Sequence, residues 1–312
     1  MTEILSTRAN HLVDPFVHVW GWEIPVYLFL GGWVAGVMIL AGFFLWHGRH
    51  TRRACTCFVL PLLAIVVLSL GMGALFLDLE HKLYTWRLYL TFVPWSPMSW
   101  GAWILILVYP VLAAMSLVRP PALLAAFFPV LDEWSEALNR RPRALKFLAG
   151  TSMASGAALG IYTGVLLSAL GARPFWNSAL LGPLFLASGL SAGAAFAHMV
   201  ARDPEEGIAL ARADNAFLMV ELLLIGLLLI GLGTTSEAHA AAVGLVLGGP
   251  FTAVFWVLVV GLGILVPLLI QGLAVTHRIT HTPIAPMLVM LGSLALRFVV
   301  VYAGQYSHWA RV

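Results

Sequence analysis

Charged residues are scarce in this chain. Only 10% of its 312 residues are Asp, Glu, Lys or Arg, whereas 61% are hydrophobic. A soluble domain carries about 25% charged residues, so this composition predicts a polytopic helical membrane protein. The absence of long stretches that alternate apolar and polar residues argues against an outer-membrane barrel. The net charge of +3 does not indicate a nucleic-acid ligand, because the basic residues lie at the ends of the predicted helices.

Residues that bind redox cofactors are equally scarce. Cys55 and Cys57 are the only cysteines, too few for an iron–sulfur cluster or a disulfide framework. His198 is the only histidine well inside a predicted span, whereas a bis-histidine haem needs two facing histidines. Gly-rich nucleotide loops and His/Glu metal motifs are also missing. We therefore expect no haem, no metal and no redox centre in this chain. The first 20 residues lack the short apolar core of a cleavable signal peptide.

Long apolar runs dominate what is present. A bilayer-spanning helix needs about 20 apolar residues, and such runs fall at roughly 24–46, 55–79, 98–117, 146–170, 178–200, 215–233, 250–275 and 284–306. The predicted fold is all-α, with eight transmembrane helices in one integral membrane domain over residues 1–312. Pro-rich residues 118–145 form the longest loop, in which Val130 to Asn139 is predicted to be a short interfacial helix.

Two segments of the chain resemble each other. Leu28 to Gly36 in the first span is similar to Phe185 to Gly193 in the fifth, and Tyr162 to Gly164 is similar to Tyr302 to Gly304. Four spans per unit preserve chain direction, so the pattern predicts a parallel repeat of residues 20–170 and 178–306. Such a repeat would give two four-helix bundles side by side. The alternative is chance similarity between Gly-, Ala- and Leu-rich helices.

The loops differ in charge. Loops after the odd-numbered spans carry eleven basic residues: Arg49, Arg52, Arg53, Arg119, Arg140, Arg141, Arg143, Lys146, Arg202, Arg212 and Arg278. The opposite side carries five: Arg8, Lys82, Arg87, Arg173 and Arg311. The positive-inside rule therefore predicts that both termini lie outside the cytoplasm.

Ionisable and polar groups inside the spans are candidates for function, because each costs several kcal/mol to bury in a bilayer. On the predicted outer side lie Glu23, Tyr27, Asp78, His81, Trp100 and Tyr162. Deeper, or towards the cytoplasm, lie His198, Glu221, Gln271 and Arg297. The second set is predicted either to line a partial proton route or to form separate hydrogen bonds between helices. Each outer residue also has a structural alternative, such as a helix-capping role for Glu23.

Four motifs occur in order along the chain. They are Trp22 to Gly32, Ser96 to Gly101, Tyr162-Thr163-Gly164 with Pro174 to Asn177, and Arg297 to Gln305. Together these motifs resemble the polysulfide reductase membrane-subunit family (NrfD/PsrC) over about residues 20–306. The resemblance implies a haem-free, eight-helix subunit that exchanges electrons between menaquinone or ubiquinone and a four-cluster ferredoxin-like iron–sulfur subunit on the outer face. It further implies a catalytic partner, which is a molybdopterin enzyme, a multihaem cytochrome or a hydrogenase, and a location in the bacterial or archaeal cytoplasmic membrane.

The resemblance also implies where the quinone binds. In the family, polar residues of the first helix and a tyrosine of the fourth form the site, which here means Glu23, Tyr27 and Tyr162. A histidine that some members carry on the first helix is replaced by Tyr27, so Asp78 or His81 is predicted to handle the proton. Two other functions compete with this one: a secondary transporter or proton-translocating subunit with a mid-membrane site at Glu221 and Arg297, and a structural membrane anchor.

Overall fold

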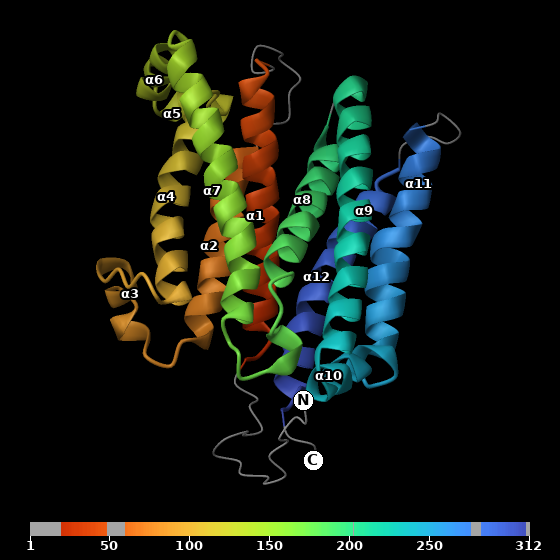
Figure 1. Ribbon diagram of the computed structural model, residues 1–312. Coiled ribbons are helices and arrows are strands. Elements are labelled where there is room, and N and C mark those ends of the chain that lie inside the picture. The colour runs from red at the N-terminus through yellow and green to blue at the C-terminus, as the bar shows by residue number, and fades with distance from the viewer. Residues whose placement is uncertain (1–19, 49–59, 202, 276–281, 310–312) are drawn as a thin grey trace.

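Eight long apolar helices run side by side in the molecule (Figure 1). The computed structural model describes residues 20–48, 60–201, 203–275 and 282–309, and these eight helices are counted within those residues. Each is long and apolar enough to cross a membrane. The chain is therefore a multi-pass membrane protein with an all-helical fold.

The bounds of the helices largely match the predicted spans. The spanning helices are α1 (Glu23–Trp46), α2 (Leu60–Asp78), α4 (Pro97–Leu117), α7 (Pro142–Ser168), α8 (Leu181–Val200), α9 (Pro204–Thr235), a π-helix (Val254–Leu265) continued by α11 (Val266–Val275), and α12 (Ile284–Tyr306). The shorter helices are η3 (Lys82–Tyr84), α3 (Arg87–Leu90), α5 (Ala122–Phe127), α6 (Val130–Asn139), η4 (Pro174–Trp176) and α10 (Glu237–Leu247). The short helix predicted at Val130 to Asn139 is confirmed as α6. Cys55 and Cys57 lie outside the described residues.

The predicted start of the sixth span was wrong. Helix α9 begins at Pro204, whereas the apolar run alone placed the start near residue 215. The local sequence explains the earlier start: the Asp203 side chain accepts a hydrogen bond from the Glu205 amide (3.2 Å), and Pro204 occupies the first helical turn. Glu205 and Glu206 in that turn also suit the positive end of the helix dipole.

Helix α1 lies at the centre of the molecule and is the most buried of the spans. It packs against α2 and α7 in its own half of the chain and against α8 and α12 in the other half. Helix α4 packs against α2 and α7, while α9, α11 and α12 pack around the α8 side. Because α1 contacts both halves extensively, the division into two four-helix bundles stays a prediction.

Glycines allow α1 and α8 to cross with their backbones in contact. A Cβ added to Gly36 would overlap the carbonyl of Gly189, and one added to Gly189 would overlap the carbonyl of Gly32. A Cβ added to Gly193 would likewise lie 2.8 Å from the Gly36 carbonyl carbon. Close approach through small residues is the usual packing of membrane helices. The two segments on which the repeat was predicted therefore lie against each other, although the repeat itself stays a prediction.

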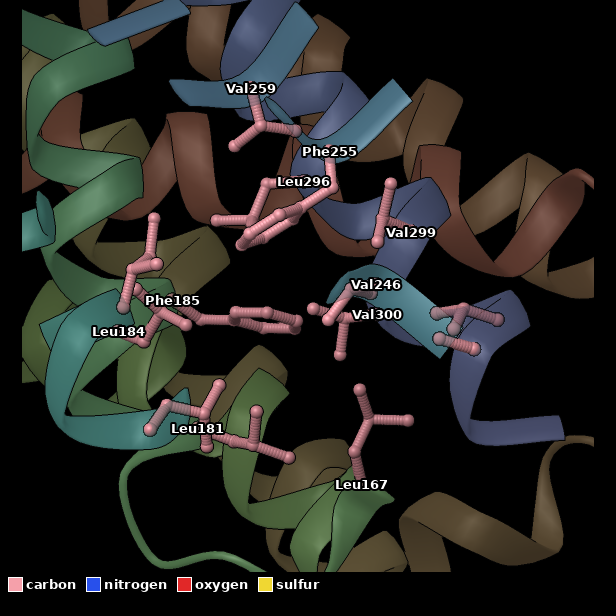
Figure 2. Packing of buried hydrophobic residues seen from close by; sticks show 14 of the residues in the cluster. Leu167, Leu181, Leu184, Phe185, Val246, Phe255, Val259, Leu296, Val299 and Val300 are labelled. Atoms are coloured by element: carbon pink, nitrogen blue, oxygen red, sulfur yellow. The ribbon is translucent and has the colours of Figure 1, made fainter. Parts of the chain in front are cut away.

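Large apolar side chains pack around α8 on the side that faces α10, the π-helix and α12. Phe185 of α8 packs among residues of α10, the π-helix and α12, including Val246, Phe255 and Val300 (Figure 2). Leu167 of α7 closes the same cluster from the side of the first half. These contacts, together with the glycine crossing, fix the position of α8 relative to α1.

Both described ends of the chain lie at one end of the molecule, where α1 begins and α12 ends (Figure 1). Because the predicted basic loops connect the spans at the opposite end, we expect this end to face outward. A reporter active only in the periplasm, fused after Val312, is expected to be active. Activity from a cytoplasm-only reporter at the same position would contradict the assignment. The control is the same periplasmic reporter fused within the exposed helix α6, where it is expected to be inactive.

Candidate functional site

A cavity of about 200 Å³ opens between α1, α2, α4 and α7 at the end where the termini lie. Its lining is mainly apolar, with Ile24, Leu28, Met72, Ala102 and Leu105 among the residues that contribute. Three ionisable groups from three different spanning helices interrupt this lining: Tyr27 of α1, Asp78 of α2 and Tyr162 of α7. The structure thus brings together half of the predicted outer set at one apolar cavity.

The two phenol groups of the cavity come from buried tyrosines. Tyr27 is 3% exposed and Tyr162 is 6% exposed. Neither hydroxyl forms a hydrogen bond within the described part of the chain, so both can donate to a bound molecule. Gly101 makes the position of Tyr162 possible, because a Cβ at Gly101 would overlap the Tyr162 hydroxyl. Gly101, in the second turn of α4, therefore leaves space for the Tyr162 side chain to contact this helix.

Further glycines along α7 allow close packing on both sides of Tyr162. A Cβ on Gly156 would lie 2.9 Å from the Ala35 carbonyl of α1, and one on Gly164 would overlap the backbone of Leu181. Helix α7 therefore packs with direct backbone contact on both sides of Tyr162. Its side chain is consequently fixed in direction.

Asp78 ends α2 at the mouth of the cavity. Glu23, at the start of α1, lies close enough to act electrostatically on the Asp78 carboxyl group, although Glu23 does not line the cavity. A fourth polar group, Tyr89 of α3, does line it. Partial burial, and secondarily the nearby Tyr109, raises the pKa of the Tyr89 hydroxyl above its ordinary value. Tyr89 therefore stays a protonated hydrogen-bond donor at neutral and moderately alkaline pH.

Trp20, just before α1, forms one wall of the cavity and is fixed by the end of α12. The Gln305 side chain accepts a hydrogen bond from the Trp20 amide and donates one to the Trp20 carbonyl, both at 3.0 Å. The Trp20 ring also packs at 5.2 Å from the ring of Trp176. Gln305 therefore ties the far half of the chain to the cavity wall.

Two residues of the predicted outer set lie elsewhere. Trp100 is 41% exposed, and its indole nitrogen donates to the Pro94 carbonyl at 2.7 Å, so it fastens the loop before α4. His81 is exposed beside Tyr84, with ring centroids 6.4 Å apart. Neither lines the cavity. The prediction that they belong to one site with Tyr27 and Tyr162 came from depth and residue type, which do not determine on which face of a helix a side chain lies.

A second polar region lies at the contact between α8, α9, α11 and α12, and Arg297 is its most buried member at 0% exposure. Its Nη1 donates to the Ser188 hydroxyl (2.5 Å), the Ser293 hydroxyl (2.6 Å) and the Ser293 carbonyl (2.9 Å), and Nη2 donates to the Phe185 carbonyl (3.1 Å). The guanidinium also lies over the Phe185 ring, 5.0 Å from its centroid. Glu221 of α9 bonds to Ser188 and interacts electrostatically with Arg297.

One member of this region, Asp214 of α9, was not predicted from the sequence. Asp214 is 0% exposed and accepts hydrogen bonds from Ser191 (2.6 Å) and from Gln271 (2.7 Å). It was missed because the predicted span began one residue later, which placed Asp214 in a loop. The signal was available: Asp214 precedes Glu221 by seven residues, so the two carboxylates share one face of a helix. The helix-start signature at Asp203-Pro204 would have brought Asp214 inside.

Comparisons with known proteins place the chain among membrane subunits. A family model described as "Polysulphide reductase, NrfD" matches residues 10–307. The chain belongs to the NrfD family. Among its relatives, the C subunit of the polysulfide reductase of Wolinella succinogenes is 30% identical over 307 residues, covering 92% of this chain and 94% of the relative. Protein NrfD of Escherichia coli is 32% identical over 311 residues, covering 93% and 96%.

Membership in the NrfD family confirms the resemblance drawn from the four sequence motifs. It identifies the chain as a membrane subunit of the kind found in respiratory oxidoreductase complexes. Within the described residues, no three His, Cys, Asp or Glu side chains lie close enough together to hold a metal ion.

Proposed function

We propose that the cavity between α1, α2, α4 and α7 binds the head group of a quinone or quinol. One observation carries the proposal: Tyr27, Asp78 and Tyr162 arrive from three spanning helices at a cavity whose lining, apart from Tyr89, is otherwise mainly apolar. A quinone head group has an apolar ring and two carbonyl oxygens that accept hydrogen bonds, and these are the features this lining matches. Menaquinone and ubiquinone share this chemistry, so the proposal covers both.

The residues of the cavity divide the chemistry between them. The Tyr27 and Tyr162 hydroxyls donate hydrogen bonds that orient the head group, and their protonated state suits the carbonyl oxygens of a quinone. Oxidation of a quinol releases two electrons and two protons, and Asp78 at the cavity mouth accepts a proton and passes it to solvent. Reduction of a quinone takes the same steps in reverse. Glu23 lies beside Asp78 and provides a second carboxylate towards the surface.

The electrons leave to, or arrive from, a partner subunit at the same end of the molecule. The segment around η3 and α3 exposes large apolar side chains there, including Leu83 at 87% and Trp95 at 89% exposure. Arg87 lies over the Tyr84 ring at 4.6 Å within this segment. An exposed apolar and aromatic surface of this kind marks a site of contact with another protein or with the membrane interface. We propose that it contacts an iron–sulfur subunit of the four-cluster ferredoxin type, which connects to the catalytic subunit of the complex.

Tyr162→Phe and Asp78→Asn are each expected to lower quinol-dependent electron transfer at least tenfold in the assembled complex. A tenfold loss corresponds to about 1.4 kcal/mol, a reasonable value for one lost hydrogen bond to a group that develops charge. The rate is measured with a soluble quinol analogue and the native electron acceptor, after the amount of assembled complex has been determined.

Matched controls are available for both variants. Tyr306→Phe removes a hydroxyl from an exposed tyrosine outside the cavity, and Asp132→Asn neutralises an exposed carboxylate on α6. Both controls are expected to keep wild-type rates. Wild-type rates in both Tyr162→Phe and Asp78→Asn would show that quinone does not react in this cavity.

A further inference from the structure

The polar residues between α8, α9, α11 and α12 form a row along one face of α9. Asp214 and Glu221 are seven residues apart, so they lie on the same face at a separation of roughly 10 Å along the axis. His198 of α8 continues the row in the other direction, because its ring lies against Gly207, seven residues before Asp214. At its far end, Arg297 lies against α1, where a Cβ on Gly32 would be 2.9 Å from Nη2.

Charge is not balanced in the middle of this row. Two fully buried carboxyl groups, Asp214 and Glu221, face one buried guanidinium, that of Arg297. Glu221 interacts with Arg297 directly and through Ser188. Asp214 has neutral hydrogen-bond partners only, the Ser191 hydroxyl and the Gln271 amide. An unpaired buried charge costs several kcal/mol in a membrane, so the region is electrically neutral only when one carboxyl group carries a proton.

Gln271 points to Asp214 as the carboxyl group that gains the proton. The Gln271 side chain is 2% exposed, and its Oε1 has no hydrogen-bond partner while its Nε2 donates to Asp214. Rotation of the amide by half a turn exchanges the two atoms, and Oε1 then accepts from a protonated Asp214. Gln271 can therefore form a hydrogen bond with Asp214 in either protonation state. Arg297 gives Glu221 the counter-charge that Asp214 lacks.

We propose that Asp214 is a proton-binding site that exchanges its proton with the membrane face at which α9 begins. Ser191 of α8 and Gln271 of α11 contact it directly. The titratable or charged groups further along are His198 of α8, Glu221 and the buried Glu206 of α9, and Arg297 of α12. The adjoining π-helix presents only apolar side chains and glycines along Val254–Leu265. His198 lies at the start of the row, and the proposed exchange requires bridging water molecules because the intervals are too long for direct proton transfer.

Infrared spectroscopy of the purified full-length chain tests the proposal directly. At neutral pH the wild-type protein is expected to show the carbonyl stretch of a protonated carboxyl group, which declines on titration to alkaline pH and is missing from Asp214→Asn. This variant retains the fold, because Asn still accepts from Ser191 and the rotated Gln271 accepts from its amide. A hydrophobic carbodiimide, which reacts with protonated carboxyl groups, is expected to modify Asp214 and not Glu221 in wild-type protein. The wild-type labelling does not depend on how the variant folds.

The functional measurement uses the native complex in proteoliposomes with a quinone analogue as electron acceptor, because reduction of each quinone takes up two protons. Asp214→Asn is expected to reduce the part of this uptake that comes from the side at which α9 begins by at least tenfold, while affinity for the quinone analogue is unchanged. Asp132→Asn, on exposed α6, is the control and retains uptake. Modification of Glu221 instead of Asp214, absence of an Asp214-dependent carboxyl band at every pH, or wild-type uptake in Asp214→Asn would each overturn the proposal. The infrared and labelling outcomes do not depend on whether quinone binds beside Tyr162.

Discussion

Replacement of Gly189 by leucine is expected to leave little folded protein in the membrane. The residue lies where α8 crosses α1, and even a single added carbon would overlap the Gly32 carbonyl. Overpacking of a core typically costs about 1–3 kcal/mol and occasionally more. Here the obstructing atoms belong to the backbone, which cannot move aside as a flexible side chain does, so we expect a cost above that range.

The size of this effect is measured as the yield of monodisperse protein after detergent extraction and as the midpoint of thermal unfolding. Gly226→Leu is the matched control, because Gly226 lies in the spanning helix α9 with no atom within 4 Å of an added Cβ. This control is expected to keep wild-type yield and midpoint. Equal behaviour of the two variants would mean that the α1–α8 crossing contributes little to stability.

Arg297→Gln is expected to destabilise the chain by about 3–5 kcal/mol, the usual cost of breaking a buried charge pair from one side. The substitution removes the donors to Ser188, Ser293 and the Phe185 carbonyl. It also leaves the Glu221 carboxylate without its counter-charge. The loss is measured as a lowered unfolding midpoint in a fixed detergent.

A second substitution separates the electrostatic part of this effect from the loss of hydrogen bonds. Glu221→Gln combined with Arg297→Gln removes both charges, so the double variant is expected to be more stable than Arg297→Gln alone. With Glu221→Gln measured alone as well, the departure of the double variant from the sum of the two single effects is the coupling energy of a double-mutant cycle. A double variant as unstable as the sum of the single variants would show that Glu221 and Arg297 do not interact.

The apolar spans could be predicted from the sequence because helices in a bilayer must satisfy their backbone internally and need a minimum length. Which spans pack against each other was harder to predict from the sequence. The four-residue spacing of Gly32 and Gly36 is typical of close approach by another helix, but only the folded chain shows that the helix is α8. The start of α9 was misplaced because Arg212 and Asp214 suggested a loop, whereas the capping signal lies earlier, at Asp203.

The candidate site could likewise be predicted only in part. Tyr27, Asp78 and Tyr162 were selected by depth and residue type, and they do meet at one cavity. Trp100 satisfied the same criteria but bonds to the Pro94 carbonyl, and nothing in its local sequence specifies that rotamer. Gly101 beside it was read only as part of a motif, yet it is the residue that admits the Tyr162 ring. Convergence of side chains from separate helices depends on helix rotation, which periodicity does not define in uniformly apolar spans.

The crossing of α1 and α8 also sets the order in which the chain can assemble. Helix α1 is synthesised first, whereas its glycine partner on α8 follows roughly 150 residues later, an interval of roughly 8–30 s at ordinary rates of synthesis. During that interval the glycine face of α1 is covered by lipid tails or by the helices made in between. The most buried helix of the finished molecule is therefore the one that spends longest incompletely packed.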